Sequence, residues 1–169
     1  MTYLPLATLI TTEQDRVCEH LATLTTQMTG TIYAAMSPTQ RDQMAKRVVE
    51  NVIADFAGTQ PIEVFAQQMT RTRVHDPEYT PESIQQIIGA IATALFAVVD
   101  GAYPPEHPER EATRDAVHDL ILRDSTTCYI TFAADRQESL QSSMAEQSHL
   151  LTVLRAVSTP IIPVYDLSL

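Results

Sequence analysis

The residues able to do acid–base, nucleophilic or metal chemistry are few and scattered along this sequence. Its two cysteines, Cys18 and Cys128, lie far apart, and their spacing matches no metal site, so they are expected to be reduced thiols. No segment carries the glycines of a phosphate loop, the serine of a nucleophile elbow or the paired histidines of a zinc hydrolase. The sequence therefore predicts that the chain is not an enzyme and holds no metal.

The most specific alternative to the absence of a cofactor is that a histidine of this chain binds haem. His75 is a candidate only if the helix before it continues, which Pro77 opposes. His118 follows the apolar Val117, but an ordinary surface or core histidine is the simpler interpretation. We therefore expect no cofactor, and the sequence identifies no small ligand either.

The composition describes one folded, acidic domain. Of 169 residues, 44% are hydrophobic and 19% are charged, which allows a core and differs from the balance of a disordered chain. The net charge is −10, from 11 basic and 21 acidic residues, and it opposes binding to nucleic acid or an anionic membrane. The apolar stretch 84–99 is shorter than a bilayer span. We therefore expect a cytoplasmic protein.

Apolar residues recur at helical spacing over most of the chain, and only 4 glycines are available for turns. The predicted helices cover 13–35, 37–58, a shorter stretch after Pro61, 80–101, and a region from 109 whose core-like residues include Tyr129 and Ile130. The stretch 84–99 is apolar on more than one face, as a central helix is. Gly89 within it predicts a close crossing, because Gly costs about 1 kcal/mol relative to Ala in a helix. The sequence predicts an all-α bundle of five or six helices.

From residue 133 onward the apolar spacing changes to the alternating four and three of a coiled-coil seam. The seam positions are Ala133, Gln137, Leu140, Met144, Gln147, Leu151 and Leu154. Two glutamines on such a seam lower its stability but can set the register and favour a dimer. We expect 133–157 to pair with a second copy. The alternatives are a terminal helix packed on its own domain and a seam that binds another protein's helix.

A proline-punctuated run of β-branched residues follows this helix. The run contains Ser158, Thr159, Pro160, Ile161, Ile162, Pro163 and Val164. It resembles the junction of RsbR-type stressosome proteins, approximately L-x-x-L-S-[TA]-P-[VIL]-I-P-V, with Val157 here in place of the usual leucine. In that family the terminal helix of a sensory domain leads into a STAS (anti-sigma factor antagonist) domain. The resemblance divides the chain into a sensory domain at 1–132, a coiled-coil helix at 133–157, and a linker with the start of a STAS domain at 158–169.

The same resemblance implies a globin-like sensory domain without haem, dimeric through its terminal helix. It implies stressosome partners, both STAS proteins and a kinase, which bind through the missing C-terminal domain. The expected function is a stress-response input domain, in which a signal changes the paired helices and thereby the STAS surface. The alternatives are a globin-type sensor that binds haem or a small ligand, and a free-standing helical interaction module.

Overall fold

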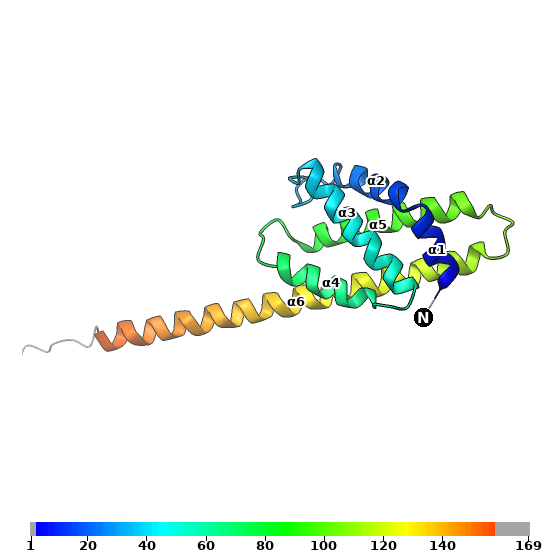
Figure 1. The fold of residues 1–169 in the computed structure, drawn as a ribbon. Helices are drawn as coiled ribbons and strands as arrows, with labels where there is room; N and C mark the ends of the chain where they lie inside the picture. The colour runs from blue at the N-terminus through cyan, green and yellow to red at the C-terminus, as the bar shows by residue number, and fades with distance from the viewer. Residues whose placement is uncertain (1–2, 158–169) are drawn as a thin grey trace, which may run out of the picture. The chain divides into compact units, whose positions relative to one another are not determined.

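The fold was analysed in a computed structural model, which describes residues 3–157 of the chain. Within this range the backbone forms six α-helices and no strand (Figure 1). The helices are α1 (Leu4–Thr12), α2 (Gln14–Thr25), α3 (Pro38–Phe56), α4 (Ile62–Arg73), α5 (Pro81–Ala102) and α6 (Arg110–Val157). The predicted all-α class is confirmed, whereas a globin-like arrangement within that class stays a prediction.

The predicted starts of α3 and α5 are confirmed by their capping interactions. The Ser37 hydroxyl accepts a hydrogen bond from the Gln40 backbone N–H, and the Gln40 side chain accepts one from the Ser37 N–H. Thr80 and Ser83 form the same reciprocal pair before α5. Each helix also has proline in its first turn, where the missing N–H costs nothing. Local sequence therefore fixes where these two helices begin.

The helix predicted from 13 to 35 is wrong in its second half, because α2 ends at Thr25 and turns follow. The hydroxyls of Thr25, Thr26 and Thr31 each donate to a carbonyl three residues earlier. Such bonds offer the backbone an alternative to helical pairing. Gly30 then adopts a φ of +73°, in the left-handed region that favours glycine. Threonine side chains and one glycine thus end the helix early.

The first helix, α1, was not expected from the sequence. Its Leu6 and Ile10 are fully buried, and it packs against α3. The Tyr3 backbone N–H donates to the Phe56 carbonyl at 2.8 Å, which ties the start of α1 to the end of α3. α2 packs on both α3 and α5, so the N-terminal helices cover the centre of the bundle.

α5 contributes more buried residues to the bundle than any of α1 to α4. Its buried residues are Ser83, Ile84, Ile87, Ile88, Ala90, Ile91, Ala94, Leu95, Val98 and Val99. Among the described residues it is also the one helix long and apolar enough to cross a membrane, with a mean hydropathy of 1.6 over 18 residues. Half of those 18 residues are buried inside the protein. Length and composition fit a membrane-crossing helix and the central helix of a bundle alike.

The close crossing predicted at Gly89 is wrong. Gly89 lies on the exposed side of α5, and a Cβ added to it would meet nothing within 4 Å. No neighbouring helix therefore requires glycine at this position.

Gly89→Ala is expected to raise the free energy of unfolding by about 0.5–1 kcal/mol, because alanine loses less backbone freedom on folding. Urea unfolding followed by circular dichroism measures the change. Gly30→Ala is the control, since its added Cβ also meets open space but its φ is +73°. That variant is expected to lose about 1–2 kcal/mol. If Gly89→Ala destabilises the protein, the conclusion that a side chain at this position meets open space would be wrong.

The chain divides into two compact units, Met1–Ala133 and Ala134–Leu169. In the first unit, α6 contributes Val117, Leu120 and Cys128 to the buried core. In the second unit, the described side chains of the same helix are exposed, apart from the partly buried Asp135. One helix therefore serves as a core element in one unit and as an exposed surface in the other.

Candidate functional site

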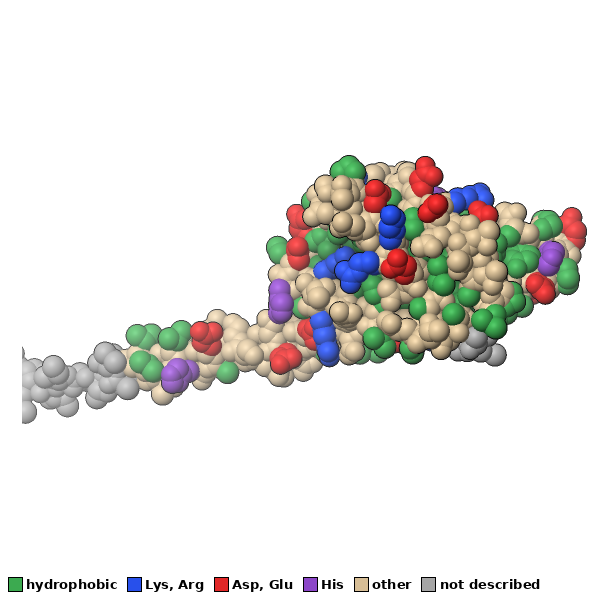
Figure 2. All heavy atoms as spheres, viewed as in Figure 1, with side chains coloured by type: hydrophobic (Ala, Val, Ile, Leu, Met, Phe, Trp, Pro, Cys, Tyr) green, Lys and Arg blue, Asp and Glu red, His purple; other side chains and the backbone are tan. Residues whose placement is uncertain are grey.

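The predicted seam lies entirely on α6, and each of its residues is exposed. These residues are Ala133, Gln137, Leu140, Met144, Gln147, Leu151 and Leu154. The four large apolar side chains among them are 58–69% exposed, and Figure 2 shows apolar side chains along this part of the helix. Apolar surface left in water is unfavourable. The seam therefore has the exposure that pairing requires, and pairing itself stays a prediction.

The family junction motif, Ser158 to Val164, lies outside the described residues. The predicted linker and STAS start at 158–169 lie outside them as well.

The two histidine candidates for haem do not lie in the core. His75 is exposed in the turn after α4, which ends at Arg73. His118 is exposed on α6, where its ring lies 4.7 Å from the Phe96 ring, centroid to centroid. Among the residues with described positions, no cluster of three or more His, Cys, Asp or Glu side chains could hold a metal ion.

Arg123 on α6 forms hydrogen bonds with side chains of two other helices. Its Nη1 and Nη2 donate to Oδ1 and Oδ2 of Asp55 on α3, at 2.9 and 2.7 Å. Nη1 also reaches Glu63 of α4 at 3.0 Å, and Nε donates to Asp119 one turn earlier at 2.9 Å. Asp55 accepts a further bond from the Ile62 backbone N–H at 2.8 Å, at the start of α4. A single guanidinium thus joins α3, α4 and α6.

The charges of this network stabilise one another. Asp55 is only 6% exposed, and burial disfavours its charged form, but hydrogen bonds from Arg123 and the Ile62 N–H outweigh that cost. The pKa of Asp55 consequently lies below its usual range. The hydrogen bond to Asp55 in turn raises the pKa of Arg123. Both groups are therefore ionised at neutral pH, and removal of either leaves the other without its main partner.

A second group of polar side chains lies fully inside the bundle, and we call it the buried cluster. Its members are Tyr33, Thr70, Tyr79, Asp124 and Cys128, none more than 2% exposed. The Cys128 thiol donates to Oδ1 of Asp124 at 3.7 Å, and the hydroxyls of Thr70 and Tyr79 hydrogen-bond at 3.2 Å. The charge of Asp124 raises the pKa of Tyr33, and the Tyr79 ring packs edge-on against Phe132 of α6 with 6.0 Å between the ring centroids. The cluster thus brings α4, α6 and two connecting segments together.

Asp124 is the member of the buried cluster that changes charge near neutral pH. Burial raises its pKa to about 7, and the negative charges of Glu63 and Asp55 add to this effect. The hydrogen bond from Cys128 and the positive charge of Arg123 act in the opposite direction. Burial also raises the pKa values of Tyr33 and Cys128, each to about 12. At neutral pH the tyrosine and the thiol are neutral, while the raised pKa of Asp124 brings its titration close to this pH.

Sequence reasoning missed both the Arg123 network and the buried cluster. A signal for the cluster was present, because Val117, Leu120, Asp124 and Cys128 recur every three or four residues on one face of α6. A carboxylate on an apolar face marks a buried polar group. The prediction that Ile130 belongs to the core is wrong, since its side chain is 65% exposed, and Tyr129 is 38% exposed. Ile130 lies about 200° around the helix from Cys128, given 3.6 residues per turn, and the Tyr129 hydroxyl donates to the Pro81 carbonyl at 3.2 Å.

Comparison with protein-family models, with curated proteins and with solved structures found no match to this chain. What the chain does must therefore be argued from α6, which carries charge contacts, a titratable buried group and an exposed apolar seam.

Proposed function

We propose that the chain is the sensory input domain of an RsbR-type stressosome protein, a cytoplasmic regulatory protein and not an enzyme. The bundle at 1–132 is a globin-like domain without haem that receives the signal. A homodimer of the 133–157 helices relays that signal to a STAS domain, which regulates a partner kinase or anti-sigma pathway. The observation that carries this proposal is the exposed seam on α6, a helix that also forms part of the core.

Pairing is favourable because it buries the large apolar side chains of the seam. Leu140, Met144, Leu151 and Leu154 are each more than half exposed. Full burial of one such side chain is worth roughly 1.5–3 kcal/mol, so a few of them per chain support association. The two seam glutamines reduce this gain and favour one register. A gain from the apolar side chains that is reduced by the glutamines gives a dimer of moderate stability, whose packing a signal can change.

The signal has a physical route into α6. Arg123 holds α6 to Asp55 of α3 and Glu63 of α4 at hydrogen-bond distances. Any change in the packing of α3 against α4 therefore alters the contacts that hold α6. The buried cluster adds a second connection between α6 and α4.

Oligomeric state tests the proposal. The double variant Leu151→Asp, Leu154→Asp is expected to turn a dimer into a monomer, because pairing would bury four carboxylates on one seam. Sedimentation equilibrium measures the mass, and circular dichroism checks that the helices remain. The control, Ser142→Asp with Val153→Asp, adds the same charge at exposed positions off the seam and is expected to stay dimeric.

Two outcomes would count against this relay. A wild-type chain that stays monomeric at high concentration would favour an interaction module whose seam binds another protein's helix. Equal dissociation of the control variant would show that added charge, and not the seam, separates the chains.

A further inference from the structure

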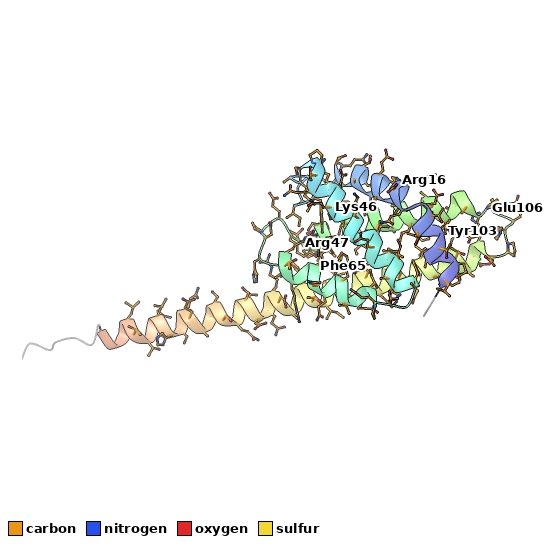
Figure 3. The ribbon with its side chains drawn as sticks, in the orientation of Figure 1. Arg16, Lys46, Arg47, Phe65, Tyr103 and Glu106 are labelled. Atoms are coloured by element: carbon orange, nitrogen blue, oxygen red, sulfur yellow. The ribbon has the colours of Figure 1, made fainter. Side chains whose placement is uncertain are left out.

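A groove of about 460 Å³ opens between α3 and α4. Its floor is apolar and consists of Met44, Phe65 and Met69, which are 6–7% exposed. Arg47 of α3 and Arg73 at the end of α4 also line it, and Figure 3 labels Arg47 and Phe65. Its volume is within the range of small-molecule sites in proteins, roughly 300–1,000 Å³.

The charge of this groove is opposite to that of the protein. The chain carries a net charge of −10, yet no Asp or Glu lines the groove. In the described part of the chain, neither Arg47 nor Arg73 forms an ion pair with a carboxylate. Figure 2 shows Lys and Arg side chains on this face of the bundle, with Asp and Glu side chains at other places on the same face. Two guanidinium groups thus border an apolar floor without carboxylate partners.

From this geometry we infer that the groove binds a small amphipathic carboxylate. The ligand's carboxylate binds Arg47 and Arg73 through charge-assisted hydrogen bonds. Its apolar body lies on Met44, Phe65 and Met69, where flexible methionines adapt to its shape. The inference rests on the proposed sensory function, because it names the class of signal that the bundle receives.

Arg73 connects the groove to the interior. Its Nη1 donates to the Tyr33 hydroxyl at 2.9 Å, and its guanidinium lies 5.2 Å from the centre of the Tyr33 ring. Tyr33 is fully buried, and it lies near enough to Asp124 of α6 that the charge of this carboxylate raises the pKa of Tyr33. A carboxylate bound to the remaining N–H donors of Arg73 offsets the positive charge beside Tyr33. Occupation of the groove therefore changes the surroundings of the buried cluster on α6.

Fluorescence titration with naphthalene-2-carboxylate tests the inference, and the absence of Trp from the chain leaves the probe's emission clear. We expect saturable binding that weakens about tenfold or more for the neutral naphthalene-2-carboxamide, because the carboxamide cannot form charge-assisted bonds. Equal affinity for the two probes, or no saturation with the carboxylate, would overturn the inference.

Two exposed positions of the groove supply variants that leave the core intact. Arg47→Gln removes one positive charge, and Gln43→Glu places a carboxylate in the groove. Each is expected to weaken binding of naphthalene-2-carboxylate about tenfold. Arg71→Gln, on the same helix as Arg73 but outside the groove, is the control and is expected to bind as the wild type does.

These titrations test the carboxylate site independently of the proposed dimer relay. Unchanged affinity in Arg47→Gln overturns the carboxylate site, even if the seam variants dissociate a dimer as proposed. A chain that binds the carboxylate but sediments as a monomer supports the site and contradicts the relay. A change of mass in Arg47→Gln without any carboxylate binding would assign the groove to a second protein chain and overturn the inference.

Discussion

Arg123→Met is expected to lower the free energy of unfolding by about 3–5 kcal/mol, the usual cost of removing one partner from a buried ion pair. The side chain of Asp55 is only 5% exposed, so it would lose its bidentate partner in a largely buried site. The side chain of Arg123 is 26% exposed, which places the effect toward the lower end of that range. Urea unfolding at pH 7, followed by circular dichroism, measures the loss.

The matched control is Arg110→Ala, which removes a surface ion pair with Asp100. Asp100 has an exposed side chain and keeps a second partner in Arg114, so a loss of less than about 1 kcal/mol is expected. The double variant Asp55→Asn, Arg123→Met should lose less stability than the two single variants summed, because each single variant leaves one charge without its main partner and the double variant does not. Additive losses would contradict the pairing.

The same network predicts how acid affects stability. The pKa of Asp55 is lower in the folded protein than its ordinary value. Its contribution is therefore complete above about pH 4 and is lost as the pH falls below that value. Arg123→Met should reduce this acid sensitivity, because it removes the bonds that lower the pKa.

Ionisation of Asp124 is expected to lower stability, whereas ionisation of Asp55 raises it, and the effect of Asp124 occurs at higher pH. Its pKa is about 7 in the folded protein and close to 3.9 for an ordinary aspartate. The folded protein therefore binds more protons than the unfolded chain between these values, so stability decreases as the pH rises from about 4 to about 7. Over the whole window the free energy of unfolding falls by at most about 4 kcal/mol.

Asp124→Asn tests this by placing a neutral side chain of similar shape in the buried cluster. We expect the variant to be more stable than the wild type at pH 8 and to lack the decrease between pH 5 and pH 7. Urea unfolding at each pH gives the difference between the two proteins, in which the other titrating groups cancel. Glu138→Gln, exposed on the same helix, is the control and should follow the wild type. Parallel curves for Asp124→Asn and the wild type would contradict a raised pKa.

Local chemistry explains which parts of the fold were predictable. The starts of α3 and α5 follow from Ser37 and Thr80, whose bonds reach only three residues along the chain. The helical character of 133–154 follows in the same way from a repeat visible within one segment. Features that depend only on residues a few positions apart can be predicted without knowing which distant residues pack against them.

Other features depend on partners that the sequence does not reveal. The helix predicted at 13–35 ends early through threonine bonds to the backbone, and Gly89 proved to face open space. Helical spacing identifies a face of a helix, but it does not say which neighbour covers that face. Ile130 was therefore assigned to the core although its side chain is exposed.

The sequence by itself determined an acidic, all-helical chain with capped helices and an apolar seam at its C-terminal end. Only the tertiary structure decided that Arg123 meets Asp55 and Glu63, which lie 68 and 60 residues earlier. It also decided that Asp124 is buried beside Cys128, and that Arg47 and Arg73 share one groove. The physical reason is that burial and charge pairing, which set these pKa values and this groove, exist only once distant segments have packed together.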